Sequence, residues 1–84
     1  MFFVYILFSQ KNQKYYVGSS QDVEVRLLRH NKGHSSFTKN GIPWILVYKE
    51  SFATRTEAVQ REKYIKSQKS TIYIQNLISL SSDG

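Results

Sequence analysis

FFVYILF, at residues 2–8, decides the fold, because β-branched and aromatic side chains make it the clearest strand of the chain. A polar turn at residues 9–13 leads from it into a second predicted strand, Lys14 to Gly18. Two neighbouring strands joined by so short a loop must run antiparallel. The chain therefore begins with a predicted β-hairpin.

A helix is predicted directly after the hairpin. Asp22 can cap a helix that runs to about Asn31, and Gly33 lies just beyond its end, where glycine is favoured. The helix carries its apolar residues on one side, at Val23, Leu27 and Leu28.

A polar segment separates this helix from a third strand. Residues 33–41 are rich in Ser, Lys and Asn and predict a surface loop. Pro43 then opens a strand through residues 44–48, since proline is tolerated at the first residue of a strand. We expect this strand to join the sheet that the hairpin begins.

Two further helices are predicted. Thr54 and Glu57 form a capping box, in which each side chain serves a backbone donor, at the start of a helix that ends near Ser67. Residues 71–74 would suit a strand nearly as well as a helix. The apolar residues of this segment recur at helical spacing, at Tyr73, Leu77 and Leu80. We therefore predict a last helix over residues 70–80.

These elements predict one small domain over residues 1–80 and a disordered tail at residues 81–84. The fold class is α/β (α+β), with a small three-stranded antiparallel sheet flanked by helices in the order β-β-α-β-α-α. No apolar run approaches the roughly 20 residues that span a bilayer, and the opening lacks the positive leader of a signal peptide. We therefore expect no membrane association and a cytoplasmic location.

The formal net charge is +6, from 12 Lys and Arg residues against 6 acidic ones. Such a balance favours polyanionic partners, for example nucleic acid or an anionic membrane surface. The chain has no cysteine, which excludes disulfides, thiolate zinc sites and cysteine nucleophiles. Any metal must be held by oxygen or imidazole.

Glu62 is the first candidate for chemistry. On a helical wheel it falls among the apolar residues of its helix, so it points inward or along the rim of the core. Those residues are Ala58, Val59 and Ile65. A carboxylate is rarely placed there without a partner. The alternatives are an ordinary surface position or an ion pair with a lysine.

Arg26 and His30 are four residues apart and therefore share one face of the first helix, while Arg29 points away. A guanidinium and an imidazole at one helix edge can hold a phosphate bidentately and exchange a proton beside it. The alternative is a solvated helix edge.

Tyr5 and Tyr16 stand on the two strands of the hairpin. Tyr15 and Tyr16 must point to opposite faces of the sheet, so only one of them can share a face with a given neighbour. Gly18 lies between a strand and a helix, where it allows close backbone approach by a turn or a ligand.

Taken in order, these residues resemble a GIY-YIG nuclease domain. The set consists of Phe3-Val4-Tyr5, then Tyr16-Val17-Gly18 after ten intervening residues, then Arg26, His30 and Glu62. The resemblance covers about residues 2–80 and extends to small stand-alone members of the family, which are similar to the catalytic domains of excision-repair nucleases and homing endonucleases. Phe3 replaces the first glycine of the motif, and Val17 is a conservative change.

The resemblance implies a metal-dependent endonuclease that hydrolyses DNA phosphodiester bonds, structure-selective or weakly specific, in DNA repair or recombination. Arg26 would hold the scissile phosphate, His30 would orient or relay a proton for a tyrosine, and Glu62 would bind one Mg²⁺ or Mn²⁺ ion. Tyr16 is a candidate base with Tyr5 assisting, and which of them takes the proton stays open. A free tyrosine has a pKa of about 10, so nearby cations must help it lose a proton.

A wider set of residues would contact the nucleic-acid backbone, at Gly18, Lys32, His34, Lys39, Lys63 and Lys66. Such contacts are salt-sensitive and largely independent of sequence, and ordinary solubilising lysines are the alternative. Some relatives carry a lysine shortly after the second motif, where this chain has Ser19 and Ser20. Asn76 is a poor match to a C-terminal asparagine that supports the site in parts of the family.

Two other functional classes stay open. A non-catalytic nucleic-acid-binding module would keep the fold and the charge but would not need Glu62. A small interaction or scaffold protein would use the basic surface to contact another protein. The oligomeric state, monomer or homodimer, is also open, and one active site would need a dimer or two encounters to cut both strands.

Overall fold

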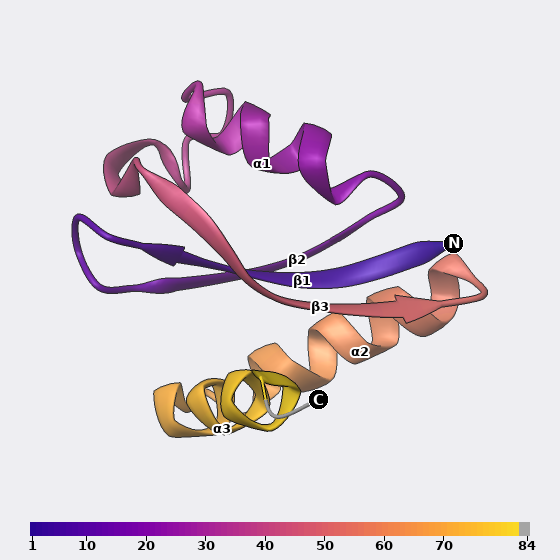
Figure 1. Ribbon diagram of the computed structural model, residues 1–84. Coiled ribbons are helices and arrows are strands. Elements are labelled where there is room, and N and C mark those ends of the chain that lie inside the picture. The colour runs from indigo at the N-terminus through magenta and orange to yellow at the C-terminus, as the bar shows by residue number, and fades with distance from the viewer. Residues whose placement is uncertain (83–84) are drawn as a thin grey trace.

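A computed structural model describes residues 1–82 of the chain, and its element order confirms the predicted fold class. The elements are β1 (Phe2–Ser9), β2 (Tyr15–Ser20), α1 (Val23–Asn31), a 3₁₀ turn η1 (Lys39–Gly41), β3 (Trp44–Phe52), α2 (Arg55–Ser67) and α3 (Thr71–Ser82). Figure 1 shows α1 on one face of the sheet and both C-terminal helices on the other.

The sheet is antiparallel with strand order β2-β1-β3, so β1 is central and β2 is an edge strand. β1 occupies the centre of the sheet because its side chains are apolar on both faces, and residues 4–7 are fully buried. In the register of the hairpin, Tyr5 lies opposite Gly18 and Leu7 opposite Tyr16. β3 continues to Phe52, past the predicted end at residue 48, because the polar residues 49–51 still pair with β1.

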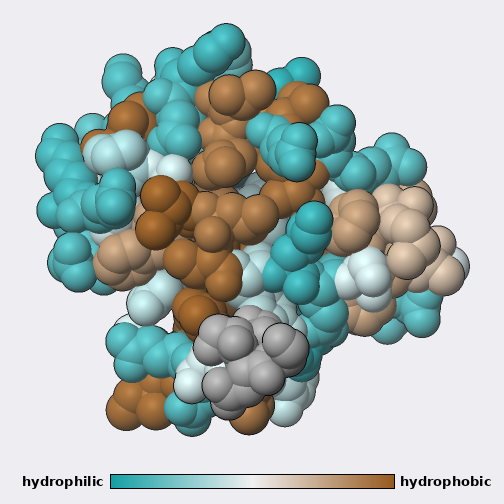
Figure 2. Space-filling view, viewed as in Figure 1, coloured by the Kyte–Doolittle hydropathy of each residue, from teal (hydrophilic) through white to brown (hydrophobic). Residues whose placement is uncertain are grey.

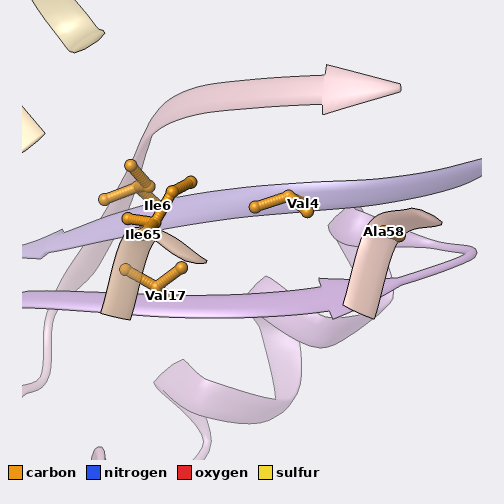
Figure 3. Close-up of a cluster of buried hydrophobic side chains, with 5 residues drawn as sticks. All are labelled: Val4, Ile6, Val17, Ala58 and Ile65. Atoms are coloured by element: carbon orange, nitrogen blue, oxygen red, sulfur yellow. The ribbon is translucent and has the colours of Figure 1, made fainter. Parts of the chain in front are cut away.

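Alternate side chains of β1 divide the core into two clusters. Figure 3 shows the first cluster, which packs against α2 and consists of Val4, Ile6, Val17, Ala58 and Ile65. The second cluster lies on the α1 face and consists of Tyr5, Leu7, Val23 and Trp44, with Tyr16 packed against it. Both motif tyrosines therefore lie on the α1 face, opposite α2.

The molecular surface follows this layering. Figure 2, viewed from the same side as Figure 1, shows hydrophobic residues gathered at the level of the sheet and hydrophilic residues around them. Within residues 1–82, no helix has the length and apolar character needed to cross a bilayer.

The helix ends form as the capping residues predict. Asp22 Oδ1 accepts a hydrogen bond from the Val25 N–H at 3.1 Å, and Thr54 and Glu57 form the reciprocal capping box of α2. Gly33 adopts a φ of +79°, a left-handed conformation that glycine reaches without strain. α3 extends beyond Leu80 to Ser82, and the rest of the expected tail, residues 83–84, lies outside the described residues.

Two predicted apolar positions are wrong. Leu28 is 59% exposed and Leu80 is 73% exposed. In α1 the buried residues are Val23 and His30, and the imidazole can lie inside because both of its ring nitrogens have hydrogen-bond partners. In α3 the core contacts come from Ile74 with Tyr73 and Leu77.

Gly18→Ala should destabilise the fold by about 1–3 kcal/mol, the usual cost of overpacking a filled site. An added Cβ would lie 2.6 Å from the Tyr5 hydroxyl oxygen and 3.1 Å from Cε2 of Tyr16, so both rings would have to move. Chemical denaturation measures the effect. Ser51→Ala, an exposed change on β3, is the control and should stay within about 0.5 kcal/mol. Equal stabilities for the two variants would contradict the tight packing of Tyr5 on Gly18.

Candidate active site

A buried chain of hydrogen bonds links β1 through His30 of α1 to the loop that follows this helix. The Tyr5 hydroxyl lies 3.2 Å from Nε2 of His30, and Nδ1 of His30 lies 2.8 Å from the Thr38 hydroxyl oxygen. The Thr38 hydroxyl also donates to the Ser35 carbonyl at 3.5 Å. All partners are satisfied when Nδ1–H donates to Thr38 and Nε2 accepts from Tyr5. This arrangement holds the imidazole in one tautomer and one orientation.

Thr38 itself is fixed from a second side. It is fully buried, and its carbonyl accepts a hydrogen bond from the indole N–H of Trp44 at 2.7 Å. Trp44 in turn is tied to the end of α1, because Asn31 bonds both its backbone N–H and its backbone carbonyl. The loop after α1 is therefore anchored beneath His30.

Burial keeps both members of the Tyr5–His30 pair neutral. It raises the pKa of Tyr5, while the Arg26 guanidinium acts against that rise and the charge on Glu62 adds a small increase. Burial also lowers the pKa of His30, and the positive charge of Arg26 lowers it further. The Tyr5 hydroxyl is therefore placed to donate a hydrogen bond to the neutral His30 imidazole, and this bond fixes the orientation of both rings.

Tyr16 occupies a different position. It is partly exposed, and with residues of α1 and the following loop it lines a surface hollow of about 360 Å³, formed by Tyr16, Arg26, Arg29, His30, His34 and Ser35. A water molecule or a phosphate in this hollow can reach Tyr16, whereas Tyr5 is fully buried. The two guanidiniums give the hollow the character of an anion site.

Glu62 lies on the α2 side of the sheet, at the edge strand β2. One carboxylate oxygen accepts from the Ser19 hydroxyl of β2 at 2.6 Å, and the other lies 2.6 Å from the Lys66 ammonium. Lys66 Nζ also lies 5.9 Å from the centre of the Tyr16 ring. The position at the rim of the core and the ion pair with a lysine are thus both present. Glu62 and Tyr16 project from opposite faces of the sheet, so the five motif side chains do not line one common hollow.

A single Mg²⁺ or Mn²⁺ ion fits this carboxylate. Among residues 1–82, no group of three or more His, Cys, Asp or Glu side chains could hold a metal together. Mg²⁺ does not require such a group, because it commonly keeps several waters and binds through one or two carboxylates and a substrate phosphate. Glu62 is therefore the residue that would hold such an ion, which would compete with the Lys66 ammonium for the carboxylate.

The remaining predicted residues divide into three groups. Gly18 is buried, and the close approach it permits is that of the Tyr5 ring, not of a ligand. Lys32, Lys39 and Lys63 are exposed and do not line the hollow, whereas His34 does. Asn76 is exposed on α3, a helix that packs against β3 at the far side of the sheet from β2.

Sequence reasoning missed three residues. The prediction that Arg29 points away is wrong, because Arg29 lines the hollow with Arg26 and His30, and the i, i+3 spacing of the two arginines was the available signal. The Ser19 hydroxyl donates a hydrogen bond to Glu62. Because neighbouring residues of a strand point to opposite faces, the alternation of Ser19 with Gly18 was the signal for the face of the sheet on which Ser19 lies. No local sequence pattern indicates a role for Thr38, because its hydroxyl meets the His30 ring only after the loop between them has folded.

Thr38→Val should cost about 1–3 kcal/mol of stability, because it leaves the Nδ1–H of a buried imidazole without its acceptor at nearly constant volume. Denaturation gives the stability, and ¹⁵N NMR of the ring reports the tautomer. Thr56→Val, on the exposed face of α2, should stay within about 0.5 kcal/mol and leave the ring unchanged. An unaltered His30 tautomer in Thr38→Val would show that Thr38 does not orient the ring.

Comparison with known proteins gives a consistent set of matches. A family model described as the GIY-YIG catalytic domain matches residues 1–76. The chain is similar to a UPF0213 protein of Staphylococcus saprophyticus, with 37% identity over 83 residues, which cover 98% of this chain and 95% of the relative. A UPF0213 protein of Staphylococcus haemolyticus is 39% identical over 66 residues, or 77% of this chain and 79% of the relative. No solved structure matches the chain.

Proposed function

The chain belongs to the GIY-YIG catalytic domain family, a family of nucleases, and from that premise we propose that it is a metal-dependent endonuclease acting on DNA. One observation carries the proposal. The hollow that holds Tyr16, Arg26 and His30 adjoins the β2 rim, where Ser19 and Lys66 hold the carboxylate of Glu62. Nucleic-acid binding alone would not require that carboxylate.

In this proposal each residue has a separate task. Arg26, with Arg29, holds the scissile phosphate in the hollow, since guanidinium groups bind phosphate bidentately. Tyr16, as a phenolate whose own hydroxyl proton has passed to solvent, accepts the proton of the attacking water, and Tyr5 and His30 pack behind its ring. A Mg²⁺ or Mn²⁺ ion held by Glu62 would neutralise charge that develops on the leaving oxygen.

The geometry supports Tyr16 over Tyr5 as the base. Tyr5 is fully buried and engaged with Nε2 of His30, and its raised pKa opposes loss of the hydroxyl proton. Tyr16 lines the hollow, and its ring lies 4.8 Å from the His30 ring and 5.9 Å from Lys66 Nζ. A bound water in the hollow would therefore meet Tyr16 first.

The proposed substrate is DNA recognised by shape more than by sequence, in repair or recombination. Arg26 and Arg29 line the hollow with the positive charge that phosphate contacts require, and such contacts position a strand without reading its bases. The binding is accordingly expected to weaken as salt concentration rises.

Incubation of the purified protein with branched, flapped, nicked and single-stranded DNA tests the proposal. We expect strand cleavage that requires Mg²⁺ or Mn²⁺ and stops when the metal is chelated. Retardation of every DNA without cleavage under either metal would instead identify a binding module of the same fold. Neither cleavage nor binding would favour an interaction protein that uses its basic surface to contact another protein.

A further inference from the structure

A second hollow, of about 310 Å³, opens on the other side of Arg26, between the start of α1 and the start of α2. It carries three guanidinium groups on its walls, from Arg26, Arg29 and Arg55. Arg26 and Arg29 also line the hollow that contains Tyr16, so these two side chains form a wall common to both. Arg55 comes from α2 and takes no part in the tyrosine site.

None of the three arginines forms a salt bridge within the described part of the chain. The two salt bridges there are Arg61–Glu50 and Lys66–Glu62, and neither involves a guanidinium of this hollow. Asp22 is the one carboxylate on its walls, and it caps α1 through the Val25 N–H. Three like charges around one depression repel one another unless an anion lies between them.

The lining of the hollow also suits a polar ligand. Ser19 and Ser20, at the end of β2, line it with small hydroxyl side chains. The Arg55 guanidinium carbon lies 5.4 Å from the centre of the Phe2 ring, which holds the group beside the hollow. A planar guanidinium held on an aromatic face is preorganised for bidentate phosphate binding.

We propose that this second hollow binds the DNA phosphate next to the scissile one, with Arg55 as its distinctive ligand. Consecutive phosphates of one strand would then lie on either side of the Arg26–Arg29 wall. The inference rests on the proposed nuclease function for the identity of the neighbouring phosphate. Its chemistry, a backbone phosphodiester on a guanidinium cluster, requires only that the protein binds nucleic acid.

Binding of a labelled single-stranded oligonucleotide, measured without metal over a series of salt concentrations, tests the subsite separately from cleavage. Arg55→Gln should weaken binding about 3–10-fold at low salt and reduce the slope of log K against log salt concentration by about 1. Arg55→Lys keeps the positive charge but loses the planar guanidinium that can bind phosphate bidentately. It should therefore retain the salt dependence of binding and lose part of the affinity.

Lys11→Gln is the matched control. Lys11 is exposed in the hairpin turn, which Figure 1 shows at the opposite end of the sheet from the start of α2. This variant should keep the wild-type slope of log K against log salt concentration and should change the affinity by no more than about twofold, because a charge far from the bound strand is largely screened by salt. Equal slopes for Arg55→Gln and Lys11→Gln would overturn the subsite, as would a wild-type protein that binds no oligonucleotide.

The failure of either proposal is recognisable. A protein that binds with the expected Arg55 dependence but never cleaves DNA retains the subsite and contradicts the nuclease function. A protein that cleaves with metal while Arg55→Gln binds like wild type retains the nuclease function and loses the subsite. Circular dichroism of Arg55→Gln should match wild type, because the side chain is exposed at the first residue of α2.

Discussion

Glu62→Gln should lower the rate of metal-dependent DNA cleavage by about 10³-fold or more, since a bound metal contributes several kcal/mol to charge stabilisation in the transition state. Glutamine has nearly the same shape, and its carbonyl oxygen can still accept from the Ser19 hydroxyl. The variant loses the negative charge that attracts a cation, so the fold and DNA binding should persist. Single-turnover cleavage at saturating protein measures the chemical step directly.

Glu24→Gln provides the control for this experiment. Glu24 is exposed in the first turn of α1, so the same chemical change there should leave cleavage near the wild-type rate. Addition of more Mn²⁺ should not restore Glu62→Gln if the carboxylate is the principal protein ligand. Cleavage by Glu62→Gln at the rate of Glu24→Gln would remove Glu62 from the active site.

The second large expected effect distinguishes the role of Tyr16 in catalysis from the role of Tyr5 in stability. Tyr16→Phe should reduce the cleavage rate by about 10²–10⁴-fold, the range expected for loss of a general base, and should change stability little. Tyr5→Phe should have the smaller effect on rate but should cost about 1–3 kcal/mol of stability, because Nε2 of the buried His30 loses its donor. Each variant is measured by single-turnover kinetics and by denaturation.

Tyr64→Phe is the matched control, because this ring is 52% exposed on α2 and its hydroxyl has no place in the site. It should resemble wild type in both measurements. A larger loss of rate in Tyr5→Phe than in Tyr16→Phe, with equal stabilities, would exchange the roles assigned to the two phenols.

The fold could be predicted from local patterns because its elements carry strong local signals. FFVYILF, the Asp22 cap and the Thr54–Glu57 box each depend on neighbours in sequence, and each forms as expected. The errors at Leu28 and Leu80 arise where tertiary packing decides the buried position. In α1 a buried imidazole replaces a leucine, and no helical wheel can anticipate the Thr38 hydroxyl that makes this burial favourable.

The candidate site was harder to predict because it lies around the edge of a sheet. The periodicity of α2 turned Glu62 toward the rim of the core, but it could not show that α2 covers the face opposite Tyr16. With β2 at the edge of the sheet, Ser19, Glu62 and Lys66 meet there, and Lys66 Nζ lies 5.9 Å from the centre of the Tyr16 ring. Strand order depends on long-range pairing, which short motifs do not specify.

Paramagnetic broadening by Mn²⁺ tests the central claim most directly, namely that Glu62 and Tyr16 serve one site although they project from opposite faces. In an NMR titration at low Mn²⁺ concentration, the wild-type resonances of Ser19, Lys66 and the Tyr16 ring should broaden first, and Glu62→Gln should abolish this broadening. Broadening that is unchanged in Glu62→Gln, or that spares Tyr16 while affecting residues elsewhere, would contradict a shared metal and phosphate site at the β2 edge.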